Sequence, residues 1–430
     1  MNKQGSNKWY WIIAASLFLV MMFNCGLGFY SLSLFVTPIT RSFGISSGDF
    51  AMLYVFYGVG SAAAAAFFHS LLKRFALKSL IVSGGLISAA GYFVFAGSDR
   101  LEAMFLGGVL IGASTVFSGT AAVQMAIARW FSERRSQITG LVASASGVGT
   151  AVGSPIVGWM IHALGWRAAC VAIGALVAVF VCVQIALLFR EEPGCVGLAP
   201  YGESQGAVKG EMVVTPGGGC PLREGIKRPA FWLFAGGMSV VAVVYQMISL
   251  YQSTILIERG VPEAVAAACL SVFAVVDMCS KASAGIIADR FGFRIVTLYC
   301  AGATALAFLL IRVVDGTVGA VLFSALLGFW PTMCVLYGVT ASISLFGKRY
   351  LSEYIGFSQT LMCCCSLVGM PLIRTLYNAV GSFDTVMNIA VGLLAAFAVM
   401  MTRMLREANF FREKTGGRAR PGVDEHEDFL

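Results

Sequence analysis

The sequence is poor in charged residues and in histidine. Only 12% of its 430 residues are charged, and it holds three histidines, His69, His162 and His426. A soluble domain keeps roughly a quarter of its residues charged to cover its surface. With 58% hydrophobic residues and 49 glycines, the composition excludes a soluble globular protein. It predicts a polytopic membrane protein.

Residue clusters that bind metals or catalyse reactions are also missing. The histidines are dispersed, and no Cys/His group has the spacing of metal ligands. Most of the twelve cysteines lie in apolar runs such as MCCCSLVG, where a thiol acts as a small packing residue. These absences argue against a membrane enzyme and lead us to expect no metal and no cofactor. The sequence also has no Asn-x-Ser/Thr sequon, which favours a bacterial inner membrane.

Long apolar stretches fill most of the chain. A helix needs about 20 residues to cross ~30 Å of hydrocarbon. The first stretch is longer than the core of a signal peptide and ends without a cleavage site, so we expect it to be retained. The sequence predicts an all-α membrane protein with twelve transmembrane helices in two six-helix bundles. The stretches are residues 9–37, 48–71, 79–97, 101–128, 138–162 and 167–189, then 230–257, 264–288, 294–312, 316–346, 352–378 and 384–404.

A polar segment separates the two sets of stretches. Residues 190–229 are rich in Gly and Pro and predict a linker between an N-terminal bundle, 1–189, and a C-terminal bundle, 230–406. Residues 407–430 predict a tail, with disorder from about Arg406 onward. Lys and Arg concentrate in alternate loops, which places both termini and the linker in the cytoplasm. The net charge of +8 therefore reflects orientation, and no nucleic-acid partner is expected. Neither the linker nor the tail is large enough for the output domain of a sensor.

One loop pattern occurs in full after the eighth stretch and in degraded form after the second, where His69 and Ala76 replace its two glycines. The eighth stretch ends in Gly-x-x-x-Asp-Arg-x-Gly-x-Arg, and HSLLKRFALK follows the second stretch with Lys73 in place of the aspartate. The second-half copy resembles the cytoplasmic loop signature of the major facilitator superfamily, whose two six-helix halves work by alternating access. In that family the loop helps hold the cytoplasmic gate shut, with a partner here expected near Ser352, Lys348 and Arg349. The resemblance implies gating roles for Gly285, Asp289, Arg290, Gly292 and Arg294.

Three further stretches resemble the monocarboxylate transporters and the oxalate–formate antiporter group. They are the first span, with KWYW and GFYSLSLFVTPI; the linker, with EEPGCVGLAPYG and IKRPAFW; and the start of the fifth span, ARWFSERRSQITG. The last implies gating roles for Arg134 and Arg135. The fifth span also carries a stripe of small residues for close helix packing. This stripe contains Gly149, Gly153, Pro155 and Gly158 and loosely resembles the superfamily's fifth-helix antiporter motif.

The eighth stretch contains the two charged side chains that we place well inside a span, Asp277 and Lys281. Asp277 lies about 18 Å along the helix from Asp289, near mid-membrane. Each charge at that depth costs roughly 2.5–3.5 kcal/mol on insertion scales. Spaced by four residues, the two share a helix face and can form an ion pair. The pair is either a structural salt bridge between packed helices or part of a substrate site.

The family resemblance favours a site. Monocarboxylate transporters carry an Asp followed four residues later by an Arg, which bind the substrate carboxylate and couple it to a proton. Here Lys281 replaces the Arg, and a point charge lacks the bidentate fork of a guanidinium. The lysines that this group often carries in the first or eleventh helix are absent near Asn24 and in MCCCS. One cation at mid-membrane favours a monoanion, which would compete with Asp277 for Lys281 and leave Asp277 to take a proton.

The sequence leaves the coupling open. Proton symport and exchange against a second carboxylate both fit, and drug efflux is a more distant alternative. We expect a small organic anion as substrate, protons or a counter-substrate as coupling partner, a lipid bilayer as environment, and a monomer. Arg374 is a second candidate cation, unless it snorkels to the interface. Further candidates for substrate contact are Tyr30, Gln124, Tyr245, Gln246, Trp330 and Tyr337.

Overall fold

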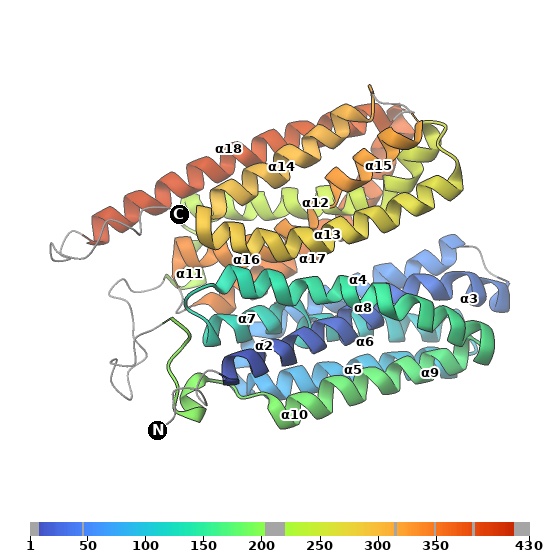
Figure 1. Cartoon of the computed structure of the whole chain (residues 1–430), viewed down its shortest axis with the longest axis horizontal. Helices are drawn as coiled ribbons and strands as arrows, with labels where there is room; N and C mark the ends of the chain where they lie inside the picture. The colour runs from blue at the N-terminus through green and yellow to red at the C-terminus, as the bar shows by residue number, and fades with distance from the viewer. Residues whose placement is uncertain are drawn as a thin grey trace. The chain divides into compact units, whose positions relative to one another are not determined.

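The computed structural model describes residues 8–44, 47–202, 220–313, 316–347, 350–380 and 383–416 (Figure 1). The described residues are almost entirely helical and contain no strand, only an isolated bridge between Phe131 and Tyr201. The chain divides into two compact units, Met1–Gln205 and Gly206–Leu430. The all-α fold predicted from the sequence is confirmed.

The first unit begins with a helix that changes its winding. It starts as α2 (Lys8–Val20), becomes π-helical in η1 (Met21–Phe29) and 3₁₀-helical in η2 (Tyr30–Phe35), and ends as α3 (Val36–Phe43). The remaining elements are α4 (Ser47–Arg74), α5 (Leu77–Gly97), α6 (Leu101–Phe117), α7 (Thr120–Trp130), α8 (Arg135–Leu164), α9 (Trp166–Val177), the π-helical η3 (Ala178–Val183), α10 (Gln184–Leu188) and the short η4 (Pro193–Val196).

The second unit is built around one apolar core. Trp330, Tyr337, Phe234 and Phe397 are fully buried there, and their rings contact one another. Its elements are α11 (Leu222–Gly225), α12 (Pro229–Glu258), α13 (Glu263–Phe291), α14 (Phe293–Leu310), α15 (Gly316–Leu327), α16 (Pro331–Phe346), α17 (Leu351–Val380) and α18 (Phe383–Gly416).

The helices match the predicted stretches. Within the described residues, 11 segments are long and apolar enough to cross a membrane. The remaining predicted stretch, 352–378, corresponds to the 30-residue helix α17. The expectation of disorder from Arg406 is wrong for the first part of the tail, because α18 continues to Gly416. Residues 417–430 lie outside the described residues.

Two predicted spans are interrupted. The fourth breaks at Ser118 and Gly119, where the Asn24 side-chain amide donates to Ser118 Oγ at 2.8 Å and to the carbonyls of Ser114 and Ser118 at 3.3 Å. The tenth breaks before Pro331, which has no N–H to continue the helix. At the first break, the free backbone carbonyls accept hydrogen bonds from Asn24, a side chain of a distant segment. The local sequence pattern therefore did not reveal this break.

The first span crosses α8 at the distance of backbone contact. A Cβ added at Gly149 would lie 2.2 Å from the Met22 carbonyl oxygen, and one at Gly26 would lie 2.6 Å from the Ser146 carbonyl oxygen. Only residues without a side chain permit this approach. Gly158 differs from the rest of the predicted stripe, because a Cβ there would meet nothing within 4 Å.

Gly149→Ala is therefore expected to destabilise the protein. The added methyl group must push two backbones apart, an overpacking cost of about 1–3 kcal/mol. The melting temperature of the detergent-solubilised protein measures this loss. Gly158→Ala, on the same helix, is the matched control and should leave the melting temperature unchanged or raise it, since alanine favours a helix over glycine by up to about 1 kcal/mol. Equal melting temperatures for the two variants would contradict the close crossing.

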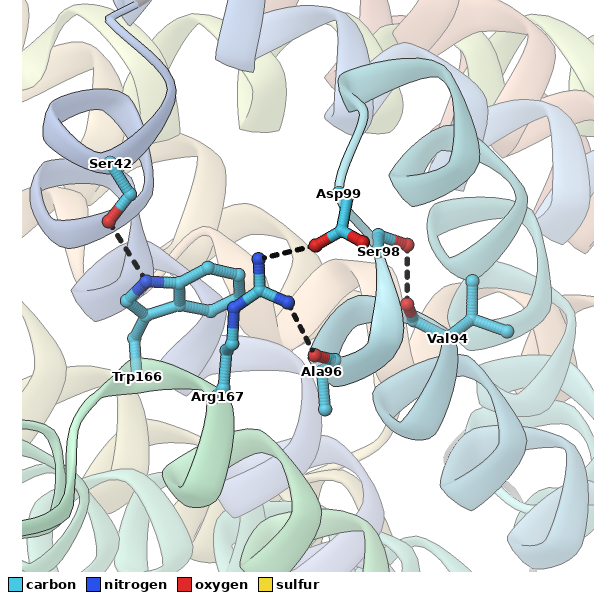
Figure 2. A network of polar contacts seen from close by, with 7 residues as sticks. All are labelled: Ser42, Val94, Ala96, Ser98, Asp99, Trp166 and Arg167. Atoms are coloured by element: carbon cyan, nitrogen blue, oxygen red, sulfur yellow. Dashed lines mark hydrogen bonds and ion pairs between the residues drawn. The ribbon is translucent and has the colours of Figure 1, made fainter.

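Polar contacts tie helix ends together in each unit. In the first, Arg167 at the start of α9 pairs with Asp99 at 3.0 Å and donates to the Ala96 carbonyl at 3.1 Å, and Trp166 donates to Ser42 Oγ at 3.0 Å (Figure 2). In the second unit, Arg259 and Arg312 both pair with Asp384. Exposed ion pairs contribute at most about 1 kcal/mol each. Their main effect is to fix the ends of neighbouring helices.

Candidate functional site

The charged pair lies on one face of α13. Lys281 Nζ donates to Asp277 Oδ2 at 2.7 Å, with the lysine side chain 7% exposed and the aspartate side chain 15% exposed. Val275 and Cys279, on other faces of the same turns, are exposed. The i,i+4 spacing thus turns both charges inward, toward the unit's own helices. The ion pair expected from the sequence is present.

The pair is incompletely satisfied. Asp277 Oδ1 is buried and has no hydrogen-bond partner in the described part of the chain. An ionised carboxylate accepts several hydrogen bonds, and an unmet buried acceptor costs about 1–3 kcal/mol. A structural salt bridge is expected to satisfy both oxygens. The open oxygen is therefore a reason to read the pair as a binding site.

Two neighbouring helices bring polar groups to Lys281. Tyr245 of α12 and Cys334 of α16 lie near enough to interact electrostatically with its ammonium group. Tyr245 and the next candidate, Gln246, are half-buried. An ammonium group has three N–H donors, so it can hold Asp277 and still donate to a second anion. Lys281 therefore has donor capacity beyond its bond to Asp277.

A network of hydroxyl groups holds α13 next to the pair. Ser280 Oγ lies 2.8 Å from Thr332 Oγ1 of α16 and 3.2 Å from the Tyr299 hydroxyl of α14. Ser280 and Thr332 are fully buried. These contacts fix the rotation of α13, and with it the direction of Lys281, the next residue. These contacts were not predicted from the sequence, in which the polar Ser280 between the two charges was the available signal.

The other candidate contacts differ in environment. Trp330 and Tyr337 are fully buried in the apolar core and donate to the carbonyls of Val241 at 3.2 Å and Phe234 at 3.4 Å, which indicates packing. Gln124 is buried in α7 of the first unit. The side chains of Tyr30 and Arg374 lie outside the described residues.

The loop predicted to act in gating is a short turn between two helices. α13 ends at Phe291 and α14 begins at Phe293, joined by Gly292 with φ of +88°, a value that favours glycine. Gly285 is buried. The charged residues Asp289, Arg290 and Arg294 are exposed at this end of the unit. The partner expected for Asp289 lies near Ser352, in the first turn of α17, and the neighbouring Lys348 and Arg349 lie outside the described residues.

The loop before α8 is strained. Arg134 has φ of +53°, the one non-glycine residue with positive φ in the described ranges, and Arg135 Nε donates to the Phe131 carbonyl at 3.0 Å. A left-handed conformation costs a non-glycine residue about 1 kcal/mol or more, and strain of this kind persists where the surroundings hold it. The hydrogen bonds between this loop and Tyr201 stabilise the left-handed conformation.

A separate cavity of about 260 Å³ lies in the first unit, between η1, α8 and α9. Its lining consists of Gly149, Gly153 and apolar side chains such as Val152, Ile156 and Met160. An anion in such a cavity would lose its hydration without gaining a hydrogen bond. The cavity is therefore not the anion site.

Comparison with known proteins agrees with this architecture. The sequence model of the Major Facilitator Superfamily matches residues 17–344. Monocarboxylate transporter 12-B of Danio rerio is 24% identical over 92% of this chain and 86% of its own length. Monocarboxylate transporter 3 of Rattus norvegicus is 23% identical over 91% of this chain and 79% of its own length.

Solved structures share the fold. FucP, a major facilitator superfamily transporter in the outward conformation, aligns with a TM-score of 0.69 at 13% identity, over 92% of this chain and 99% of its own. A second structure of FucP, the E. coli fucose:proton symporter, aligns with a TM-score of 0.70 at 12% identity, over 92% of this chain and 98% of its own. These relatives are transporters and not enzymes. With a matching family model over most of its length, the chain is a multi-pass membrane transporter that belongs to the Major Facilitator Superfamily and resembles its monocarboxylate transporters.

Proposed function

We propose that the chain carries a small monocarboxylate across the membrane together with a proton, by alternating access. The observation that carries this proposal is the buried Asp277–Lys281 pair, in which one carboxylate oxygen has no partner within the described residues. The names of the relatives support a monocarboxylate as the class of substrate.

The pair suggests how binding and proton uptake are linked. The substrate carboxylate forms an ion pair with Lys281 and displaces Asp277 from it. Asp277, now without its cation in a buried place, takes a proton. The loaded site then contains one ammonium, one carboxylate and one neutral acid. A neutral site avoids the cost of moving a net charge across the hydrocarbon.

The same charge balance favours symport over obligatory exchange. The empty site is also neutral, because Lys281 and Asp277 then pair with each other at 2.7 Å. Both the loaded and the empty transporter can therefore reorient, which net uptake requires. Obligatory exchange needs an empty form that cannot reorient. Export of drugs is a poorer match, since the pair suits small acids.

The charge pattern sets the orientation in this proposal. Lys and Arg concentrate in alternate loops, and this pattern supports a cytoplasmic position for the linker and both termini. We place the protein as a monomer in a bacterial inner membrane. One cation in the described site suits a monoanion rather than a dianion.

Uptake by purified protein in proteoliposomes tests the function. With acidic buffer outside, labelled monocarboxylates such as lactate, pyruvate or formate should accumulate, and a dianion such as oxalate should not. Dissipating the proton gradient with an uncoupler should stop accumulation. If labelled substrate enters only when vesicles are preloaded with a carboxylate, and a proton gradient has no effect, the protein is an exchanger. No carboxylate flux in any condition would overturn the proposed function.

A further inference from the structure

Neighbouring helices hold the break in the tenth span in place. The break comprises residues 328–330, between the end of α15 and the start of α16. Trp330 is fully buried, and its Nε1 donates to the Val241 carbonyl of α12 at 3.2 Å. The Phe329 ring contacts the Tyr299 ring of α14 edge to face, with the ring centroids 5.4 Å apart. The break is therefore a fixed part of the packed unit.

The helix that carries the charged pair, α13, lies against this break at two points. A Cβ added at Gly328 would lie 2.9 Å from the Phe273 carbonyl oxygen and 2.9 Å from Val276 Cβ. One turn further along α13, Ser280 Oγ lies 2.8 Å from Thr332 Oγ1, in the first turn of α16. Residues three, four and seven apart share a helix face. One face of α13 therefore packs on the break, by a close approach at one point and a hydrogen bond at the other.

The charged pair lies directly beside that face. Asp277 and Lys281 each follow, by one position, a residue that touches the break, which is a rotation of about 100° around the helix. A lysine carries its charge at the end of a flexible four-carbon stem. The rotation of α13 therefore decides which groups the ammonium can reach, and here it brings Lys281 near Tyr245 and Cys334.

We propose that residues 328–332 form a packing surface that fixes the rotation of α13 and so directs Lys281 toward the substrate carboxylate. Ser280 and Thr332 are the main positioning residues, because they act through Lys281. Tyr299 assists them, since its hydroxyl lies 3.2 Å from Ser280 Oγ and ties α14 to the same point. This inference rests on the proposed function, because it explains how the anion site is held.

Ser280→Ala is the first test variant, and Ser283→Ala is its matched control. Ser283 is exposed, and its hydroxyl donates to the Cys279 carbonyl of its own helix at 2.8 Å. Ser280→Ala removes the hydrogen bond to α16, so the KM for the carboxylate should rise by about five- to tenfold. The maximal uptake rate per folded protein should change less. Ser283→Ala should keep the KM of the wild type.

Two substitutions at Thr332 separate a positioning role from a merely structural one. Thr332→Val keeps the shape of the side chain and removes its hydroxyl, so it should raise the KM as Ser280→Ala does. Thr332→Ser keeps the hydroxyl and should retain a KM close to that of the wild type. A merely structural role would lower the melting temperature and the yield of active protein but leave the KM of the folded protein unchanged. Wild-type KM values in both Ser280→Ala and Thr332→Val would overturn the proposal.

A labelling experiment tests the packing surface without any substrate. Position 281 is 6% exposed. In the variant Lys281→Cys, adding Ser280→Ala should let α13 rotate and should speed modification by 2-aminoethyl methanethiosulfonate severalfold, whereas adding Ser283→Ala should not. Ser280→Ala with Lys281 intact controls for the native cysteines. Equal labelling rates in the two double variants would contradict a fixed rotation of α13. If the wild-type protein carries no carboxylate, the proposed function fails, and the labelling rates alone decide whether the break fixes α13.

Discussion

Lys281→Ala is expected to abolish carboxylate uptake. It removes the cation that we assign to substrate binding, and no other lysine or arginine in the described part of α13 lies at its depth. A hydrogen bond to a charged group contributes about 1.5–3 kcal/mol, so substrate affinity should fall at least tenfold and coupling to Asp277 should be lost. Uptake in proteoliposomes and substrate-induced thermal stabilisation measure the two effects.

Loss of folding must be separated from loss of binding. Lys281→Ala leaves Asp277 buried and unpaired, which costs about 3–5 kcal/mol when it stays ionised. The double variant Asp277→Ala with Lys281→Ala removes both charges and should recover the melting temperature without recovering uptake. Lys281→Arg keeps the charge and should retain part of the activity. Uptake at the wild-type rate by the double variant would show that the pair is a structural salt bridge.

Asp277→Asn is expected to separate carboxylate exchange from proton coupling. The asparagine side chain does not ionise, so position 277 can no longer take up or release a proton. It also no longer competes with the substrate carboxylate for Lys281. Substrate affinity should therefore rise by about tenfold, given the energy of one hydrogen bond to a charged group. Counterflow of labelled carboxylate should continue, while accumulation driven by an acidic exterior should be lost.

A pH series of uptake rates checks this expectation. Wild-type uptake should increase as the external pH falls, because Asp277 takes up a proton more readily when the substrate binds. Asp277→Asn should lack this pH dependence. Asp99→Asn is the control, since Asp99 pairs with Arg167 in an exposed contact at a helix end. It should behave as wild type. Accumulation by Asp277→Asn that still follows the proton gradient would assign the coupling to another residue.

Features with a local pattern could be predicted from the sequence. The apolar stretches predicted the spans because the length of a membrane-crossing helix is fixed by the bilayer. The ion pair followed from helix periodicity, since residues four apart share a face. Gly292 of the loop signature lies between α13 and α14 and has a positive φ, which favours glycine.

Features formed by distant segments could not be predicted in this way. The break of the fourth span depends on Asn24 from the first span, 94 residues from Ser118. The docking of the first part of the linker, residues 190–202, depends on Tyr10, Trp130 and Tyr201, which no periodicity relates. Trp330 and Tyr337 were candidates for contact because they are polar aromatics in a span, yet neighbouring carbonyls satisfy them inside the core. The local sequence pattern locates helices and turns, but tertiary packing decides which polar groups lack a hydrogen-bond partner within the protein.

Chemical restoration of a charge at position 281 tests the role of the pair most directly. Lys281→Cys should be inactive, and treatment with the cationic reagent 2-aminoethyl methanethiosulfonate should restore uptake by placing an ammonium group there. The neutral methyl methanethiosulfonate should not restore it, and the treated wild-type protein controls for the twelve native cysteines. Recovery requires that water reaches the position and that transport needs a cation there. Labelling without recovery, or no labelling in any state of the transporter, would contradict the assignment of Lys281 to the anion site.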